Sequence, residues 1–218
     1  MRRVAVLDFE TTGLRAGPDR IIEVAAAIVS DGEVVATFSE LMDPGFAIPR
    51  FITDFTGISD AMVRGKPSPE AVMPRLQAFL GDHACVAHNA SFDQRFYVAE
   101  MTQAAQPNDR AFVCSMLLAR RLVRQAPNHQ LGTLVRRLGL AIPPGMRAHR
   151  ALADVLMTCE LWKHLLGLLR NRLTGRDLDL SLLQGIAKKP KAAIDAYLAI
   201  LAGDGGDRRL EDRAPQRA

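Results

Sequence analysis

The chain has 218 residues, of which 48% are hydrophobic, 24% charged and 6% aromatic, and its formal net charge is +4. This length allows one domain with a sizeable core and a small appendage, and the composition excludes a disordered or collagen-like chain. The longest apolar runs, such as residues 24–29, are far shorter than the roughly 18 residues that a membrane-spanning helix needs, and no signal peptide is visible. We therefore expect no membrane partner.

Three cysteines, Cys85, Cys114 and Cys159, lie far apart in the sequence and form no CxxC pair. This pattern fits neither a disulfide framework nor a zinc site built from cysteines. It favours a reducing environment, so a cytoplasmic location is expected.

The basic residues are unevenly distributed along the chain. Residues 110–150 contain eight arginines and neither Asp nor Glu. Such a one-sign stretch indicates either a face that binds a polyanion or a solvated basic surface, and the charge pattern by itself leaves both interpretations open.

Three strands open the predicted fold, at residues 3–9, 21–29 and 34–42. The Asp31-Gly32 pair between the second and third strands predicts a tight hairpin, because a type I′ turn needs a positive φ at both central residues. The chain is therefore expected to begin as a strand, a loop and a hairpin.

Helices predominate in the middle of the predicted fold. Residues 44–69 contain several Pro and Gly and predict a loop with a short helix, followed by helical spacing at residues 69–80 and a short buried strand at 84–87. Gly139 fits the end of the last of three further helices, which are expected at residues 92–103, 115–124 and 130–138.

A long amphipathic helix is expected at residues 150–170, where apolar residues recur every three or four positions. Together with the strands it predicts a mixed α/β domain with an antiparallel hairpin in its sheet. Two short helices are then expected at residues 177–184 and 190–201, and the charged residues 203–218 are predicted to be disordered. The predicted organisation is a domain at residues 1–172, a helical appendage at 173–202 and a tail at 203–218.

Two carboxylates, Asp8 and Glu10, stand two residues apart at the end of the first strand. Side chains at this spacing leave the same face of a strand, so both arrive together at the edge of the sheet. Two close carboxylates are costly without a cation, which favours a metal site. The alternative interpretation is that they are only the polar end of a strand. The Thr11-Thr12-Gly13 sequence that follows would let backbone amides approach a phosphate closely.

Two further segments combine acidic and imidazole side chains. Residues 88–93, HNASFD, come where a buried strand meets a helix, and Asp93 could serve a site at the strand end or stabilise the first turn of the helix. In HRALAD, residues 149–154, His149 and Asp154 can face one site only if His149 precedes the helix. Otherwise Asp154 would be an acid one turn into an amphipathic helix, a position where a carboxylate needs a partner.

The segments LDFETTGL, VAHNASFD and HRALADV occur in this order, and TGIS lies between the first two. They closely resemble the exonuclease motifs of the DEDD exonucleases, in the histidine-containing (DEDDh) branch that includes the proofreading epsilon subunit of bacterial DNA polymerase III. The resemblance covers about residues 3–166. It implies a ribonuclease-H-like fold, a mixed sheet flanked by helices. It also implies a 3′-to-5′ exonuclease that releases nucleoside monophosphates from single-stranded or frayed DNA 3′ ends, in proofreading or DNA repair.

The resemblance also implies two catalytic metal ions, Mg²⁺ or Mn²⁺, and the hard oxygen donors of the motifs agree with this. Asp8 would bridge both ions, Glu10 and Asp154 would complete the shell of one, and Asp93 would serve the other. His149 would deprotonate the attacking water, because an imidazole with an ordinary pKa of about 6.5 suits a base that works near neutral pH.

For the 3′ end of the substrate, the resemblance implies a second set of residues. The backbone of Thr11 would meet the terminal nucleotide and Leu14 would wedge against the last bases. The path of the strand would be lined by His88, Asn89 and Phe92. For Leu14 and Phe92, packing in the core is an equally open interpretation.

Two other functions stay open at this point. RNA-trimming exonucleases such as RNase T and oligoribonuclease resemble the same motifs, and the sequence does not show whether a 2′-hydroxyl is accepted. The chain could also act as the docking partner of a DNA polymerase, with residues 172–218 as the contact region. Near that end, Lys188, Lys189 and Lys191 could contact phosphates or form a solvated basic turn.

Overall fold

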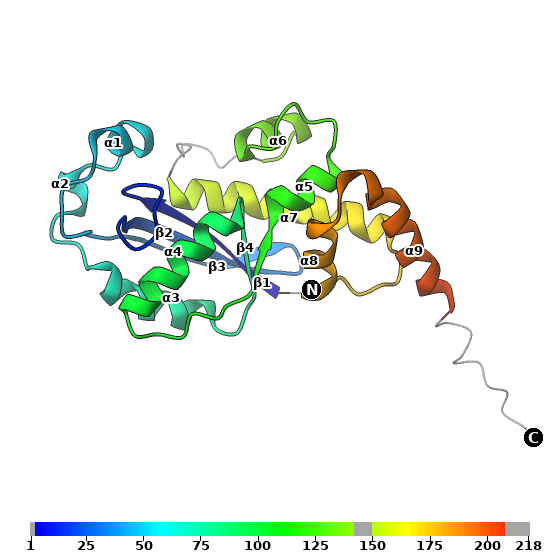
Figure 1. Cartoon of the computed structure of the whole chain (residues 1–218), viewed down its shortest axis with the longest axis horizontal. Helices are drawn as coiled ribbons and strands as arrows, with labels where there is room; N and C mark the ends of the chain where they lie inside the picture. Colours follow the sequence, from blue (N-terminus) through cyan, green and yellow to red (C-terminus); the bar gives the residue numbers. More distant parts are fainter. Residues whose placement is uncertain (1–2, 142–149, 208–218) are drawn as a thin grey trace, which may run out of the picture.

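The structure is a computed structural model that describes residues 3–141 and 150–207. Its centre is a five-stranded sheet in the order β3-β2-β1-β4-β5 (Figure 1). The first three strands pair antiparallel, whereas β4 and β5 extend the sheet in parallel with β1, so the predicted mixed sheet is confirmed. The strands are β1 (Arg3–Thr11), β2 (Ile21–Ser30), β3 (Glu33–Leu41), β4 (Cys85–Ala87) and β5 (Phe112–Cys114).

The predicted hairpin between β2 and β3 is also confirmed. Asp31 and Gly32 both have a positive φ, of 53° and 91°, and Ser30 pairs with Glu33 across the turn. The backbone of such a turn matches the right-handed twist of the strands that it joins. By contrast, β5 was not predicted.

The helices largely follow the predicted periodicity. α3 (Pro69–Leu80) has the predicted bounds, and α6 is followed by the predicted C-cap, Gly139, whose φ is 61°. The loop predicted to hold one short helix holds two, α1 (Arg50–Thr56) and α2 (Asp60–Val63). The other helices are α4 (Ala90–Gln103), α5 (Ser115–Leu122), α6 (Leu131–Leu138), α7 (Ala151–Arg172), α8 (Leu180–Lys188), the 3-10 helix η1 (Lys191–Ala193) and α9 (Ile194–Asp207). None of the helices in the described ranges is both long enough and apolar enough to cross a membrane.

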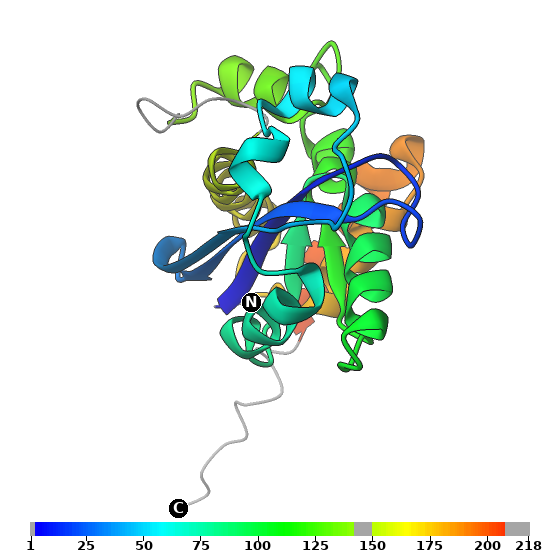
Figure 2. The same cartoon turned by 90° about the vertical axis from the view of Figure 1, so that its left-hand side faces the viewer.

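Helices cover both faces of the sheet, with α7 on one side and α4 on the other (Figure 2). Successive side chains of β1 alternate between these two layers. Val4 and Val6 join the core that contains α7, whereas Ala5 and Leu7 join the core that contains α3 and α4. Asp8 continues the even-numbered series, so the acidic end of β1 faces α7.

The C-terminal helices share the core of α7. Leu183 of α8 and Ile194 and Leu198 of α9 are buried in the same apolar cluster as Trp162. The segment expected as an appendage therefore packs directly on the domain. α9 extends to Asp207, and the disordered tail expected from residue 203 stays a prediction. The rest of the predicted tail lies outside the described residues.

Candidate active site

Three carboxylates meet at the end of β1. Asp8 and Glu10 come from β1 and Asp154 from the first turn of α7, and one oxygen of each lies within 4.8 Å of the other two. Asp154 reaches the other two because α7 packs on the face of the sheet toward which they point. The tertiary structure thus brings three of the four predicted acidic residues into one group.

Asp93 lies beside this group, on the first turn of α4, and is 2% exposed. Its charge raises the pKa of both Asp8 and Glu10. The carboxylate of Asp93 accepts hydrogen bonds from its own backbone and from the backbone of Phe9. These hydrogen bonds lower the pKa of Asp93, and the second one links α4 to β1. The left-handed backbone of Asn89, with φ of 75°, turns the chain from β4 into α4 and so sets the place of this carboxylate.

The site contains more negative charge than its surroundings neutralise. Burial raises the pKa of Asp8 well above its ordinary value, and the charges of Asp93, Glu10 and Asp154 raise it further. Burial together with neighbouring carboxylates raises the pKa of Glu10 to about 8, and burial raises the pKa of Asp93 to about 7. A divalent cation bound by these oxygens would remove the repulsion. The donor set therefore fits a hard ion such as Mg²⁺ or Mn²⁺.

Glu23 on β2 is a site residue that the motifs did not indicate. It is 3% exposed and lies opposite Glu10 in the β1–β2 pair. Arg150 donates hydrogen bonds to both of its oxygens, at 2.7 to 3.1 Å, and the backbone N–H of Ala151 donates another at 2.9 Å. Glu23 thereby fixes the beginning of α7, which holds the third carboxylate of the site. Its only signal in the sequence is that it is the one charge in the apolar residues 21–29.

The predicted general base, His149, lies outside the described residues. The next residue, Arg150, is the N-cap of α7 and has an extended backbone, with φ −131° and ψ 121°. The helix begins at Ala151. The spacing of His149 and Asp154 requires that His149 precede the helix, and the role of His149 at the site stays a prediction.

The residues predicted to hold the 3′ end of a substrate differ from one another in exposure and in contacts. Leu14 is 76% exposed and Asn89 is exposed as well, so both side chains are accessible. Phe92 is half-buried against the core of α3 and α4, and its ring lies 4.9 Å from another ring of α4, which supports packing as one of its roles. Thr11 is buried and its hydroxyl donates to the carbonyl oxygen of Gly13 at 2.6 Å. Substrate contact by these four residues stays a prediction.

His88 is held by the protein itself. Its Nδ1 lies 3.0 Å from the hydroxyl of Ser115, and its Nε2 lies 2.9 Å from the carbonyl oxygen of His129. Burial lowers the pKa of His88 to about 4, so the ring is neutral. A phosphate contact would have to replace one of these two hydrogen bonds. The described role of this side chain is to join the end of β4 to α5 and to the segment before α6, and contact with the substrate stays a prediction.

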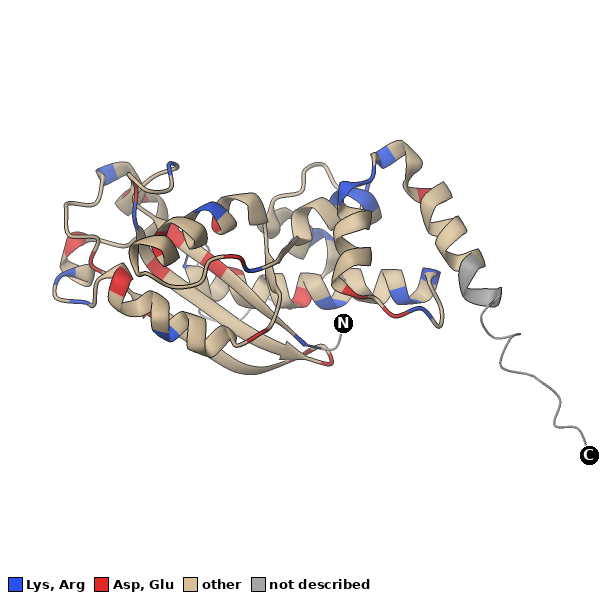
Figure 3. Cartoon of the chain, turned by 60° about the horizontal axis from the view of Figure 1, so that its bottom comes forward, with Lys and Arg blue, Asp and Glu red and all other residues tan. Residues whose placement is uncertain are grey.

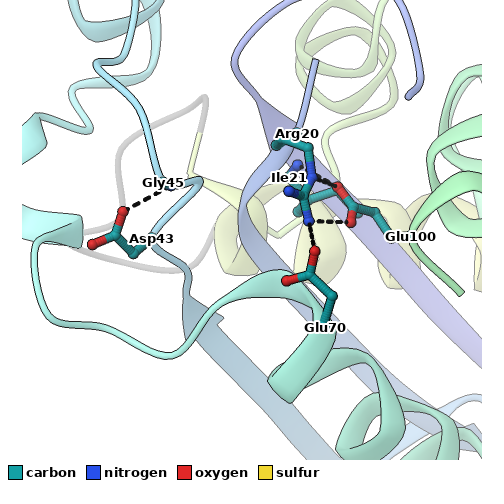
Figure 4. Close-up of polar contacts among 6 residues, drawn as sticks. All are labelled: Arg20, Ile21, Asp43, Gly45, Glu70 and Glu100. Carbon is teal, nitrogen blue, oxygen red and sulfur yellow. Dashed lines mark hydrogen bonds and ion pairs between the residues drawn. The ribbon is translucent and has the colours of Figure 1, made fainter. Parts of the chain in front are cut away.

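Arg20 anchors the loop between β1 and β2, a role that the sequence did not reveal. Its guanidinium donates to both oxygens of Glu100 at 2.9 Å and to Glu70 at 2.5 Å, and Glu100 also accepts the backbone N–H of Ile21 (Figure 4). The backbones of Arg20 and Thr12 pair across the base of the loop, with 2.9 Å between the Thr12 nitrogen and the Arg20 oxygen. The loop that presents Leu14 is therefore tied to α3 and α4.

Gly13, in the same loop, is required by a close contact. A Cβ at this position would lie 2.6 Å from the carboxylate of Asp19, whose Oδ2 accepts the backbone N–H of Arg15 at 2.7 Å. The glycine was predicted to open the backbone to a phosphate. The structure adds that packing against Asp19 leaves no room for a side chain.

The mixed sheet, the helices on both of its faces and the carboxylates at the end of β1 define a ribonuclease-H-like nuclease domain. A family model described as Exonuclease (RNase_T) matches residues 5–162 of the chain. The chain belongs to this exonuclease family, in its DEDD group of 3′-to-5′ exonucleases.

Curated relatives include large bacterial polymerases. The protein named DNA polymerase III PolC-type is 35% identical over 158 residues in Clostridium perfringens and 38% identical over 160 residues in Listeria welshimeri. Each match covers 72% of this chain but 11% of the relative. The chain therefore corresponds to a small part of these polymerases.

Solved structures agree with the fold. Exonuclease X in complex with 5′-overhanging duplex DNA is 31% identical, with a TM-score of 0.67, and the match covers 84% of this chain and 99% of that one. E. coli exonuclease I in complex with a dT13 oligonucleotide has the same TM-score at 18% identity, with coverage of 81% and 44%. The second similarity concerns the fold alone, and together they confirm the predicted ribonuclease-H-like architecture.

Proposed function

We propose that this chain hydrolyses phosphodiester bonds at single-stranded or frayed DNA 3′ ends and releases nucleoside monophosphates. The observation that supports it most strongly is the meeting of Asp8, Glu10 and Asp154 within 4.8 Å, with the buried Asp93 beside them. Phosphodiester hydrolysis builds up negative charge on the attacking and leaving oxygens, so a site that concentrates cations is suited to it.

We further infer that these four carboxylates hold two Mg²⁺ or Mn²⁺ ions. When bound, the ions would neutralise the phosphate and stabilise the attacking and leaving oxygens. The pKa of Asp8 is raised by each of the other three, which supports a central position for Asp8 as the shared ligand. The clustered donors are all carboxylate oxygens, and such donors favour hard ions over zinc.

His149 is proposed as the base that accepts a proton from the attacking water. It stands in HRALAD at the spacing from Asp154 that the motif requires. Replacing it by Ala should lower turnover about 10²-fold or more, as expected for loss of a general base. The acid limb of the pH–rate profile should disappear in this variant, whereas a merely structural residue would lower the rate at every pH alike.

DNA is the proposed substrate because exonuclease X, the solved relative at 31% identity, was found with a 5′-overhanging duplex DNA. The PolC-type relatives support a second role, in which the chain works together with a DNA polymerase in proofreading. A cytoplasmic location is proposed with them, since Cys85, Cys114 and Cys159 are all free thiols.

The deciding experiment is a cleavage time course on 5′-labelled single-stranded DNA and RNA of the same sequence, with Mg²⁺ or with EDTA. We expect a DNA ladder that shortens from the 3′ end, and we expect EDTA to abolish it. Faster cleavage of RNA would replace the DNA assignment by an RNA-trimming one. If neither polymer is cut in the presence of a divalent ion, the hydrolytic function is wrong, and binding of a polymerase by the full chain becomes the function to test.

A further inference from the structure

Two basic segments that are far apart in the sequence meet in the structure. Arg121 of α5 donates from Nε to the backbone carbonyl of Lys189, at the end of α8, over 2.9 Å. The ammonium group of Lys189 lies 4.2 Å from the centroid of the Tyr197 ring, which holds it in place. Lys191 follows two residues later and is exposed. Figure 3 shows basic residues gathered at this turn between α8 and α9.

Within the acid-free residues 110–150, several arginines already have structural partners. Arg110, Arg121, Arg124 and Arg150 each form hydrogen bonds to other parts of the fold. The side chain of Arg120, on α5, forms no hydrogen bond or ion pair with any residue in the described part of the chain. Its charge is therefore available to a partner.

The acidic residue that follows this turn is already paired with two arginines. Asp195, in the first turn of α9, forms ion pairs with Arg124 at 2.7 Å and with Arg172 at 3.2 Å. Among residues 3–141 and 150–207, Lys191 and Arg120 form no ion pair with a carboxylate. Both cations are therefore left without an acidic partner in the described part of the chain.

His88 connects this surface to the second exonuclease motif. Its Nε2 bonds the carbonyl oxygen of His129, so His129 lies against the end of β4. The positive charge of Arg120 lowers the pKa of both histidines, and that of Lys191 lowers the pKa of His129. His129 Nε2 also lies 3.1 Å from the carbonyl oxygen of Val123, just after α5, so His129 is on the side of the motif that is turned toward α5 and α8.

We propose that Arg120, Lys189 and Lys191 form a phosphate-binding surface for the part of the DNA strand that lies behind its 3′-terminal nucleotide. The inference rests on the proposed function, because a strand whose end is hydrolysed at the carboxylates must continue away from them across the protein. Cations held on packed helices can neutralise successive phosphates without any choice of sequence. The family match ends at residue 162, so the two lysines add to the shared domain a contact that belongs to this chain's own C-terminal helices.

The test compares two double variants with equal loss of charge. Arg120→Gln with Lys191→Gln alters the surface, and Arg64→Gln with Lys66→Gln removes two exposed basic residues after α2, at the far end of the molecule (Figure 1). Fluorescence anisotropy with labelled oligothymidylates of increasing length, in EDTA so that none is cut, measures binding alone. We expect the first variant to bind long oligonucleotides about tenfold more weakly and to lower the slope of log affinity against log salt by about 1.4, since each phosphate contact contributes about 0.7.

Short substrates distinguish an effect on binding at the surface from an effect on hydrolysis at the catalytic site. Thymidine 5′-(p-nitrophenyl phosphate) and a dinucleotide are too small to reach both, so we expect the first variant to hydrolyse them at the wild-type rate. Equal affinity of the two double variants for long oligonucleotides, or a wild-type affinity that does not rise with length, would overturn the phosphate-binding surface. Length-dependent binding by a wild-type protein that hydrolyses none of these substrates would instead overturn the proposed hydrolytic function and leave the surface standing.

Discussion

Glu23 and Arg150, 127 residues apart in the sequence, form an ion pair beside the acidic group, with 2.7 Å between Glu23 Oε1 and Arg150 Nη2. Glu23 lies opposite Glu10 in the sheet, where two like charges repel each other. Arg150 neutralises Glu23, so Glu10 is the carboxylate left for a cation. The same hydrogen bonds hold the first turn of α7, and with it Asp154, against the sheet.

From this pair we predict that Glu23→Gln lowers turnover by about 10- to 100-fold, the usual cost of removing a residue that orients metal ligands. Gln cannot accept the same set of hydrogen bonds, so α7 and Asp154 lose their fixed position. A titration of Mn²⁺ or Mg²⁺ against the variant should show weaker metal binding, which a general loss of stability would not explain.

The matched control for this prediction is Glu33→Gln. Glu33 also forms an ion pair, with Lys163, but lies exposed on β3 away from the carboxylates. Its replacement should leave turnover unchanged. Equal turnover in the wild type and the Glu23 variant would show that the ion pair does not position the site.

Asp8→Asn should abolish cleavage and at the same time raise the Tm of the metal-free protein. The charge of Asp8 is buried among Asp93, Glu10 and Asp154, and its removal relieves repulsion that the folded state otherwise contains. Differential scanning calorimetry in EDTA, alongside the cleavage assay, checks both parts. Wild-type turnover would refute the role of Asp8 as a metal ligand, and a lower Tm would refute the claim that the site is strained without a cation.

The stability of the metal-free protein should fall as the pH rises from about 5 to about 8. The pKa values of Glu10, about 8, and Asp93, about 7, lie above their ordinary values. At a pH between the ordinary and the raised pKa, the folded state therefore binds more protons than the unfolded state. That contribution is fully present below the ordinary pKa of a carboxyl group and is lost as the pH passes through 7 and 8.

Thermal unfolding in EDTA across this pH range measures the effect, and saturating Mg²⁺ should restore the Tm at the alkaline end. Glu10→Gln provides the comparison, because it removes one of the groups whose pKa is raised and should flatten the decline. A decline of the same size in Glu10→Gln would mean that other groups cause it.

Arg20→Ala should destabilise the protein by about 3 kcal/mol, the typical cost of removing one partner of a buried ion pair. Glu100 is 1% exposed and would lose its partner, and the loop that presents Leu14 would lose its anchor. Urea denaturation measures the change in the free energy of unfolding. Where the protein remains folded, KM for single-stranded DNA should rise more than kcat falls.

Arg75→Ala is the corresponding surface control. Arg75 pairs with Glu40, but both groups are partly exposed, and such pairs contribute at most about 1 kcal/mol. Similar losses of stability in the two variants would show that the Arg20 pair is no stronger than a surface pair.

Local patterns in the sequence determined most of the elements and the identity of the acidic residues. Alternation along β1 places Asp8 on the same face as Val6, and the Asp31-Gly32 pair specifies its hairpin. Three-and-four spacing marks α3 and α7. These features depend on neighbours within a few residues, so they can be recognised without knowing the rest of the fold.

Only the tertiary structure decided which distant residues are partners. Glu23 and Arg150 pair across the whole domain, and Arg20 finds Glu100 on α4. A lone charge in an apolar strand signals that a partner exists, but its identity depends on how helices pack across the sheet. The same packing brings α8 against α5 and so joins two basic segments into one surface. Such long-range pairings follow from the burial of apolar faces rather than from any local pattern, and for that physical reason the sequence by itself left them open.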